Sequence, residues 1–370
     1  MKSTTRRLTA TMAAAALTLS IAACSRPSSS GGSETTTAAA TTTAAGSSGG
    51  SATSASGSDT GPATASSGGD TGEELSVGFF GFAKANSFAQ ATWAGVQEAA
   101  AANNATATFL DSNFDGPTQV NQLQDAVTSK LYDVVVIQAN DGTAIVPAVK
   151  QALAAGITVV VEFTPIGGRY DTIEPQVDGV ISIVDAPTIN GEGLAEMALG
   201  ACEQLAVQPC NVAYLQGFDN YPLDAARTKA AEDAIKAGGA ELVASVIGGY
   251  TADSGRTAFQ NVLQAHPDVN VVVGSSQAIT GAAALAPDRD DLLFVGNGGS
   301  TQAFEGVMSG KWYGTYNIPE KTEGYRATEM GLAAHRGETV PTATDARSLT
   351  TYEALGTKEN LTGQTADYSD

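Results

Sequence analysis

The strongest constraint on the fold is a regular alternation of apolar runs and helical segments between residues 75 and 370. Val- and Ile-rich runs of strand length recur along this stretch, and Ala- and Leu-rich segments with helical spacing lie between them. Runs that are apolar on both faces are typical of parallel strands covered by helices on both sides. About nine or ten strands are too many for one comfortable sheet, so two smaller α/β lobes fit the pattern, and a (β/α)8 barrel fits it less well.

The expected elements follow this alternation for most of the stretch. The runs predicted as strands are 75–80, 107–110, 134–138, 158–163, 180–184, 212–215, 242–247, 269–273 and 292–295. The segments predicted as helices are 89–103, 120–130, 144–154, 189–204, 224–237, 256–265 and 324–335. The predicted fold class is therefore α/β with parallel sheets.

Residues 1–23 have the pattern of a secretory signal peptide, with basic residues followed by an apolar run over 12–23. That run is about half the roughly 20 residues that a membrane-spanning helix needs. It ends in Ile21-Ala22-Ala23-Cys24, which resembles the bacterial lipobox. The resemblance implies that Cys24 is lipidated and anchors the chain to the membrane, because the thiol carries the lipid and two or more acyl chains anchor stably.

Residues 24–73 consist almost entirely of Ser, Thr, Gly, Ala and Pro after Cys24. Such a composition does not bury enough apolar surface to offset chain entropy. We therefore predict a disordered tether between the anchor and the α/β unit.

Charge and composition argue against several classes of function. The chain carries 39 acidic and 19 basic residues, a formal net charge of −20, whereas nucleic-acid binding rests on Lys and Arg. Two His and three Cys residues provide few ligands for a zinc site. No G-x-S-x-G or P-loop motif occurs, and both His266 and His335 lie in polar helix ends. We predict no cofactor and no metal, and we do not expect an enzyme.

Several short motifs occur in the order of one family of binding proteins. They are the strand 75–80 with Asn86-Ser87-Phe88, the strand 133–138, the Gly-Ile step within 155–160, the helix start Ala225-Ala226-Arg227, and the stretches 265–269 and 294–296. With these motifs the chain resembles the type I periplasmic sugar-binding proteins of the ribose-binding class over essentially all of 75–355.

The resemblance implies two three-layer α/β/α lobes joined by three hinge crossings, near Asp185, Ile318 and Arg347. The first lobe would comprise 74–185 and about 318–346, and the second 186–317 and about 347–370. The ligand would lie in the cleft beyond the carboxyl ends of the strands. Closure of the lobes would hold it there.

The function implied is that of a monomeric, lipid-anchored solute-binding protein on the extracytoplasmic face of the cell membrane. It would capture a sugar or polyol and deliver it to an ABC permease. The alternative is a sensor that uses the same lobes to present the bound molecule to a membrane receptor. A nucleic-acid partner is not expected.

The family's positions transfer to some residues of this sequence. Asn86 and Phe88 match the amide and stacking aromatic residue of the first loop, and Phe82 lies where that loop begins. Tyr250 falls at an aromatic position of the second lobe, and Asn317 matches an amide before a hinge crossing. Aromatic faces and planar polar groups suit sugars. Alternatives stay open, because Phe82 and Phe88 also suit a core and Asn86 a helix N-cap.

Other positions depart from the family pattern. Phe163-Thr164 stands where an Asp-Arg pair is frequent, and Lys229 is the basic residue two beyond the Ala-Ala-Arg helix start. Ser276 replaces an amide, and Asn297 takes the place of an acidic residue, although it also suits a turn. The segment 218–222 is longer than expected and brings new side chains toward the cleft. The identity of the ligand therefore stays open.

Cys202 and Cys210 are the remaining thiols. An oxidising extracytoplasmic setting and an even count permit a disulfide between them. Two buried free thiols are the alternative.

Overall fold

The computed structural model describes residues 72–370. The predicted signal segment 1–23, the lipidation site Cys24 and nearly all of the tether 24–73 lie outside the described residues. The described strands form two six-stranded sheets, of order β11-β5-β4-β3-β1-β2 and β12-β10-β9-β8-β6-β7. Their pairs are parallel except for β10 and β12. The predicted two-lobed α/β class is confirmed.

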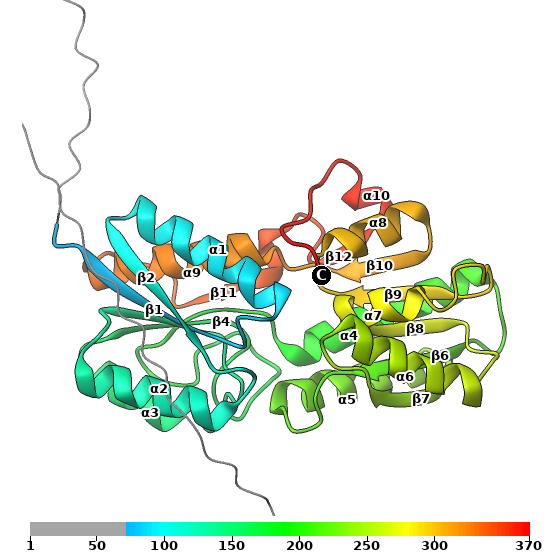
Figure 1. Ribbon diagram of the computed structural model, residues 1–370, viewed down its shortest axis with the longest axis horizontal. Coiled ribbons are helices and arrows are strands. Elements are labelled where there is room, and N and C mark those ends of the chain that lie inside the picture. Colours follow the sequence, from blue (N-terminus) through cyan, green and yellow to red (C-terminus); the bar gives the residue numbers. More distant parts are fainter. Residues whose placement is uncertain (1–71) are drawn as a thin grey trace, which may run out of the picture. The chain divides into compact units, whose positions relative to one another are not determined.

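The first lobe (Figure 1) contains β1 (Leu75–Gly81), α1 (Ser87–Ala102), β2 (Ala105–Asp111), α2 (Gly116–Ser129), β3 (Val134–Ile137), α3 (Val146–Ala154), β4 (Thr158–Phe163), β5 (Ile181–Val184), α9 (Glu320–His335) and β11 (Ala343–Asp345). Alternate residues of its strands point to opposite faces of the sheet. Val77 and Phe79 pack under α1 and α9, whereas Phe80 and Val135 pack against α2 and α3. The continuous apolar runs therefore fill two cores at once.

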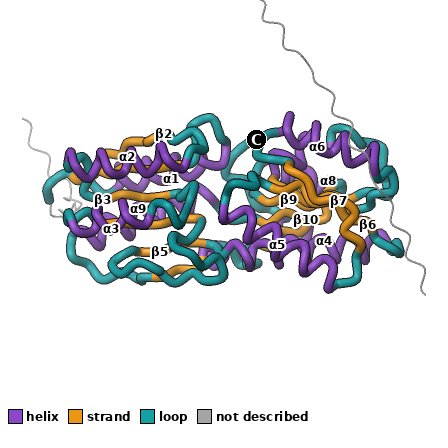
Figure 2. Tube along the Cα trace, turned by 90° about the horizontal axis from the view of Figure 1, so that it is seen from below, coloured by secondary structure: helices purple, strands orange, loops and turns teal. Residues whose placement is uncertain are grey.

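The second lobe contains α4 (Pro187–Leu205), β6 (Asn211–Gln216), α5 (Pro222–Ala237), β7 (Glu241–Ile247), α6 (Ala252–Ala265), β8 (Val271–Ser275), α7 (Ser276–Ala283), β9 (Leu293–Asn297), α8 (Thr301–Ser309), β10 (Trp312–Tyr316), β12 (Leu355–Thr357) and α10 (Lys358–Leu361). The 3-10 helix η1 (Ala346–Leu349) lies at the third crossing and packs beside α9 and β11. Helices α4 and α5 lie side by side on one face (Figure 2), and α6, α7 and α8 cover the other.

The nine predicted strand runs correspond to β1–β9, and three further strands were not predicted. Strands β11 and β12 have three residues each, and β10 reads Trp-Tyr-Gly-Thr-Tyr. These strands are too short or too mixed in polarity to stand out as apolar runs. Strands β10, β11 and β12 join the two sheets through pairing with strands that are distant in the sequence or set by the tertiary fold.

The chain passes between the two sheets three times, after β5, after β10 and after β11. Helix α9 thus follows a strand of the second sheet but packs on the first. Its first turn lies against α1, because a Cβ atom at Gly95 would stand only 1.9 Å from the carbonyl oxygen of Lys321. A Cβ atom at Gly324 would likewise stand 2.3 Å from the carbonyl oxygen of Thr92. These glycines permit the close helix contact that positions the start of α9.

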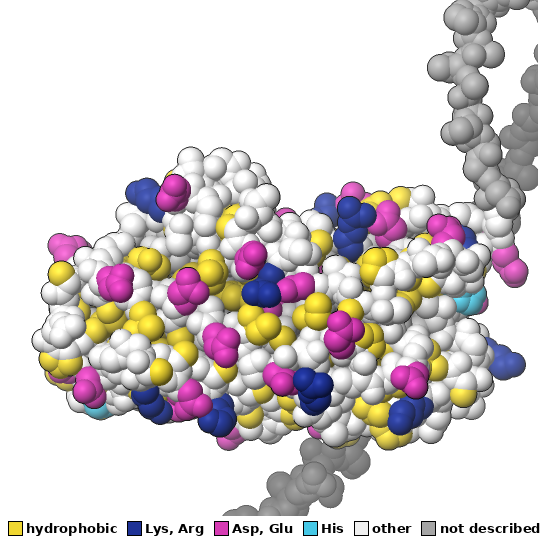
Figure 3. Space-filling view, turned by 180° about the vertical axis from the view of Figure 1, so that it is seen from behind, with side chains coloured by type: hydrophobic (Ala, Val, Ile, Leu, Met, Phe, Trp, Pro, Cys, Tyr) yellow, Lys and Arg dark blue, Asp and Glu magenta, His cyan; other side chains and the backbone are white. Residues whose placement is uncertain are grey.

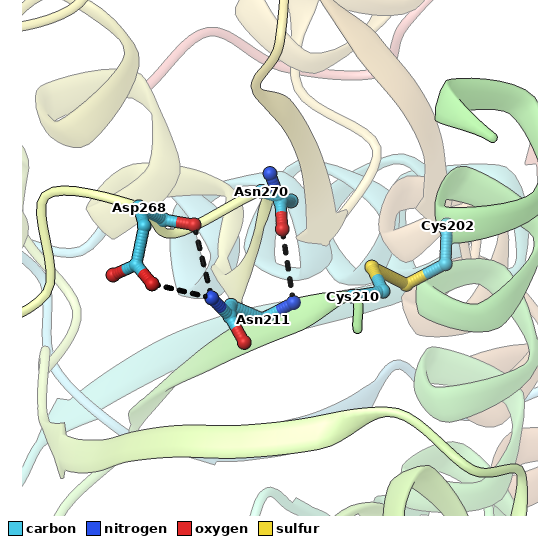
Figure 4. The surroundings of a disulfide bond; sticks show 5 residues. All are labelled: Cys202, Cys210, Asn211, Asp268 and Asn270. Atoms are coloured by element: carbon cyan, nitrogen blue, oxygen red, sulfur yellow. Dashed lines mark hydrogen bonds between the residues drawn. A yellow bond between two sulfur atoms is a disulfide. The ribbon is translucent and has the colours of Figure 1, made fainter. Parts of the chain in front are cut away.

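The structure joins Cys202, late in α4, to Cys210, just before β6, in a disulfide (Figure 4). The first residue of β6 is also fixed by side chains, since Asn270 Oδ1 accepts a hydrogen bond from the Asn211 backbone N–H at 3.0 Å. The Asn211 amide in turn donates to the Asp268 carboxylate at 2.8 Å. The start of β6, at the amino-terminal end of this inner strand, is therefore held by covalent and polar contacts.

None of the helices within residues 72–370 is both long enough and apolar enough to cross a membrane.

Candidate functional site

One cavity is bounded by both lobes and the hinge segments. The first lobe contributes Phe82, Asn86, Phe88, Phe114 and Phe163. The second lobe contributes Asn190, Tyr221, Leu223, Arg227, Tyr250, Gln277, Asn297 and Gly298. Tyr316, Ile318 and Glu320 come from the second hinge crossing and the residues beside it. Seven of the sixteen lining residues are aromatic and six are polar or charged, a mixture of apolar surface and oriented polar groups that is usual for a small-molecule site.

The aromatic side chains of the first lobe form a connected group. Phe163 meets Phe88 edge-on with ring centroids 4.7 Å apart, and it meets Phe82 at 5.9 Å. Phe163 has φ of +65° and Phe114 has φ of +59°. Bulky residues rarely adopt this left-handed region, and such strain clusters at ligand sites. The backbone is thus held in an unfavourable conformation at two positions where a ring faces the cavity.

Asn86 serves a local role and also lines the cavity. Its side-chain oxygen accepts a hydrogen bond from the Ala89 backbone N–H at 3.1 Å and so caps α1. Asn297 lines the opposite wall, where its amide exchanges hydrogen bonds of 3.1 and 3.3 Å with the amide of Asn190. Both predicted amides therefore lie at the cavity with defined orientations.

A buried ion pair forms the charged part of the second lobe's wall. Arg227 Nη1 lies 3.0 Å from Asp224 Oδ1, with side chains 6% and 2% exposed. The Tyr250 hydroxyl donates to the same carboxylate, and the Phe218 backbone N–H donates to Asp224 Oδ2 at 2.7 Å. Burial raises the pKa of Asp224, and the neighbouring Arg227 opposes that shift. The carboxylate and guanidinium thus neutralise each other inside the lobe, although the buried Arg227 Nε has no hydrogen-bond partner among the described residues.

Three glutamates are buried at the junction of β4 and α9. Glu162 and Glu323 are 0% exposed and Glu320 is 1% exposed. Glu323 Oε1 accepts a hydrogen bond from the Phe163 backbone N–H at 2.8 Å. Burial raises the pKa of Glu323 to about 8. Burial and the neighbouring glutamates also raise the pKa values of Glu162 and Glu320.

A further buried carboxyl lies at the first crossing. Asp185 Oδ1 accepts a hydrogen bond from the Tyr316 hydroxyl at 3.1 Å. Burial raises the pKa of Asp185 to about 7. Residues 72–370 hold no group of three or more His, Cys, Asp or Glu side chains placed to bind a metal ion.

The two lobes touch each other around the cavity. The Tyr221 hydroxyl of α5's N-cap donates to the Phe114 backbone carbonyl and lies 3.2 Å from Asn140 Oδ1. The Gln277 amide donates to the Ser87 hydroxyl at 3.3 Å. The structure therefore shows the lobes closed on the cavity. Tyr221 belongs to the segment 218–222, for which the sequence predicted new side chains at the cleft.

Three predicted site residues lie elsewhere. The structure corrects the prediction for Lys229, which is exposed and pairs with Asp233 at 2.6 Å. Residues two apart on a helix do not share a face, so Arg227 turns inward and Lys229 outward. Ser276 is buried beside the cavity, and its hydroxyl lies 3.3 Å from Asp370 Oδ1. Asn317 is buried behind the wall, where its amide donates to the Tyr352 hydroxyl at 2.8 Å.

Sequence reasoning did not select Arg227, Tyr316 or Glu320. Arg227 stands in the motif Ala225-Ala226-Arg227, and its spacing from Asp224 is that of an ordinary surface pair. Glu320 follows Pro319 at a helix start, where an acidic residue is common and usually exposed. Glu320 is buried where the start of α9 packs against α1 and borders the cavity.

Two closed α/β lobes with an aromatic cavity between their strand ends define a solute-binding protein. Residues 77–339 match the family described as "Periplasmic binding protein domain", and the chain belongs to this family. Membership confirms the predicted class of extracytoplasmic binding protein rather than enzyme.

Individual relatives agree with this assignment. The chain is 23% identical to the ribose import binding protein of Bacillus subtilis over 260 residues, which cover 70% of this chain and 80% of the relative. A carbohydrate transporter solute-binding protein from Agrobacterium radiobacter, solved in complex with D-arabinose, has the same fold. It aligns with a TM-score of 0.66 at 18% identity over 79% of this chain and 97% of that one.

A third similar protein comes from Mycobacterium smegmatis. It is an ABC transporter solute-binding protein solved with bound glycerol, and it aligns with a TM-score of 0.63 at 23% identity. The alignment covers 80% of this chain and 99% of that one.

Proposed function

We propose that the chain captures a small polyhydroxy compound, a sugar or polyol, in the cavity between its lobes and delivers it to an ABC permease. In this proposal residues 74–185 with about 318–346 act as one lobe, and 186–317 with about 347–370 as the other. The protein works as a monomer, and Cys24 carries a lipid that anchors it to the outer face of the membrane.

The observation that carries the proposal is the composition of the cavity wall. Aromatic rings such as Phe88 and Phe163 offer faces for the C–H surface of a sugar ring. Amide groups of Asn86 and Asn297 and the guanidinium of Arg227 offer hydrogen bonds to hydroxyls from both lobes. A ligand that contacts both lobes stabilises the closed form. This behaviour suits a protein whose closed form is recognised by a permease. The sugar- and polyol-bound relatives support this ligand class.

The first experiment is a thermal-shift and calorimetric screen of the full chain carrying Cys24→Ser. The panel contains ribose, D-arabinose, D-allose, myo-inositol and glycerol. A ligand at about 100 times its Kd adds about 2.7 kcal/mol of stability, so a binder gives a clear rise in Tm. No rise with any sugar or polyol would contradict the proposed ligand class.

The cavity itself is tested with Phe88→Ala. Loss of the ring should weaken binding of the best compound at least tenfold, about 1.4 kcal/mol, while the protein stays folded. Lys229→Ala is the matched control, because this side chain points to solvent from the same lobe that supplies Arg227. Equal affinities for both variants would show that the ligand does not bind here.

The anchor is tested separately by detergent phase partition of membranes from cells that express the full chain. The wild-type protein should enter the detergent phase and the Cys24→Ser variant the aqueous phase. Identical partition of the two would contradict lipidation at Cys24.

A further inference from the structure

One carboxyl group on the cavity wall lacks a partner. Of the acidic and basic side chains within residues 72–370, Arg227 and Glu320 line the cavity, and burial raises the pKa of Glu320 well above its usual range. Arg227 is neutralised within its own lobe by Asp224 at 3.0 Å. Glu320 is 1% exposed and has neither a hydrogen bond nor an ion pair to any residue within 72–370, and its Oε2 atom is fully buried. Buried carboxyl groups are normally paired.

The surroundings of Glu320 do not supply the missing positive charge. Glu162 and Glu323 lie behind it, also buried, and Asp185 and Asp367 are further acidic neighbours. Lys321 is next in sequence, but its amine pairs with Glu98 at 2.7 Å on the outside of the molecule. Acidic side chains are also spread over the surface (Figure 3). No Lys or Arg side chain of residues 72–370 pairs with Glu162, Glu320 or Glu323, so a positive charge brought from outside would favour the ionised form of this carboxyl cluster.

The helix that Glu320 begins accounts for its presence only in part. Glu320 is the first residue of α9, and the positive end of a helix dipole favours an acidic residue there. This effect is modest and applies to exposed side chains as well. It explains a glutamate at this position, but not one that is buried at a cavity without a partner.

The rest of the wall suits a guest with a positive group on a carbon skeleton. The rings of Phe82, Phe88 and Phe163 stand on the first lobe's side of the cavity. Aromatic faces attract cations as well as C–H groups. A carboxylate beside such rings pairs with a protonated amine and also accepts hydrogen bonds from sugar hydroxyls, but only the amine brings a positive charge to Glu320.

We propose that the ligand carries a protonated amine which pairs with the Glu320 carboxylate, so that the guest is an amino sugar or amino polyol. This inference rests on the proposed function and narrows it. A neutral Glu320 that donates a hydrogen bond to a hydroxyl is the competing arrangement, and it predicts no preference for the amine.

The test compares matched compounds that differ in one group. D-Glucosamine, D-galactosamine and 1-amino-1-deoxysorbitol are titrated against the full chain carrying Cys24→Ser, each beside its neutral parent and its N-acetyl derivative. At least one amine should bind tenfold or more tightly than its parent, and acetylation should remove that preference. Amines that bind no better than their parents would overturn the inference and leave the proposed function standing. If no compound of either kind binds, both are overturned.

The variant Glu320→Gln tests whether the preference for the amine over its neutral parent comes from Glu320. The amide keeps the shape of the side chain but not its charge, so the ratio of amine to parent affinity should fall at least tenfold while the parent's affinity changes little. Glu323→Gln is the matched control, because Glu323 is buried one turn away and does not line the cavity. Equal weakening of amine and parent in Glu320→Gln would show a neutral hydrogen bond instead. The wild-type series remains decisive if the variant does not fold.

Discussion

The two lobes bury charge in opposite ways. In the second lobe Asp224 and Arg227 neutralise each other, and a tyrosine hydroxyl and a backbone N–H complete the network. On the first lobe's side Glu162 and Glu323 are fully buried, and no Lys or Arg of the described residues pairs with them. Burying an unpaired carboxylate is costly, so such groups are either protonated or paired with a positive group of a ligand. We call the side with Asp224 and Arg227 the paired wall and the side with Glu162, Glu320 and Glu323 the unpaired wall. Of these residues Arg227 and Glu320 line the cavity itself, and the carboxyl groups of the unpaired wall depend on protons or on a ligand.

This difference assigns separate tasks to the two walls. The paired wall presents a rigid guanidinium edge whose position does not depend on the guest, since Arg227 is held by Asp224 and Tyr250. The unpaired wall adjoins the hinge, because α9 begins just after the second crossing. Charge brought by a ligand to Glu320 thus acts where the lobes are joined, which favours closure around a cationic guest.

Among the substitutions, the largest effect is expected when the paired wall is broken. Asp224→Ala leaves Arg227 buried without its counter-ion and should lower the free energy of unfolding by about 3–5 kcal/mol. Urea denaturation measures the change. Asp233→Ala removes the partner of exposed Lys229 on the same helix and should cost less than about 1 kcal/mol. Similar losses in both variants would mean that the buried pair is no more important than a surface pair.

The contrast between the walls also marks the limit of prediction from sequence. Strands β1–β9 were predictable because runs such as Val134–Ile137 are apolar on both faces, and this pattern does not depend on distant contacts. Phe82, Asn86, Phe88, Phe163, Tyr250 and Asn297 could be selected because they stand at positions that correspond to the binding site of the family that the sequence resembles, and the structure places them on the cavity wall.

The buried charges were not predictable in the same way. Asp224 and Arg227 have the spacing of a surface pair, and Glu320 has the position of a common helix-start acid. Lys229 was chosen on a motif that did not account for the helical phase of residues 227 and 229. Burial at these positions comes from packing between helices and lobes, as at Gly95 against Lys321. Local sequence carries no sign of such contacts.

The second prediction concerns the unpaired wall and pH. The pKa of Glu323 is raised from 4.5 to about 8, so the folded protein holds a proton that the unfolded chain releases. Stability is fully present below about pH 4.5 and is lost as pH rises through about 8. Asp185, with its pKa raised to about 7, acts in the same direction. We expect unfolding free energy to fall by on the order of 7 kcal/mol between pH 5 and pH 9 when both shifts act in full.

The variant Glu323→Gln tests whether the pH dependence of the unfolding free energy comes from the unpaired wall. The variant removes the titrating carboxyl group of Glu323, whose acidic neighbours are Glu162, Glu320 and Asp185. It keeps a side-chain oxygen that accepts the hydrogen bond from the Phe163 N–H. Its stability should therefore depend less on pH than that of the wild type. Glu329→Gln, on the exposed side of the same helix, should keep the wild-type slope. Parallel pH profiles for all three proteins would refute the assignment.

The smallest expected effect belongs to a residue that touches both lobes without lining either wall of the cavity. The Asp370 carboxylate accepts hydrogen bonds from Ser300 at 2.5 Å and Ser276 at 3.3 Å in the second lobe, and from Ser87 at 3.3 Å in the first. A contact across the cleft stabilises the closed form, so its loss raises the free energy that the ligand must supply for closure.

Asp370→Ala should therefore weaken binding of the best ligand about two- to fivefold, which corresponds to roughly 0.5–1 kcal/mol. Calorimetry measures the Kd, and Ser369→Ala is the control, because its hydroxyl only accepts a hydrogen bond from Gln302 within the second lobe. The ratio of amine to parent affinity should stay unchanged in Asp370→Ala, since the carboxylate acts on closure and not on the guest. A change in that ratio, or no change in Kd, would mean that the contact with Ser87 does not contribute to closure as described.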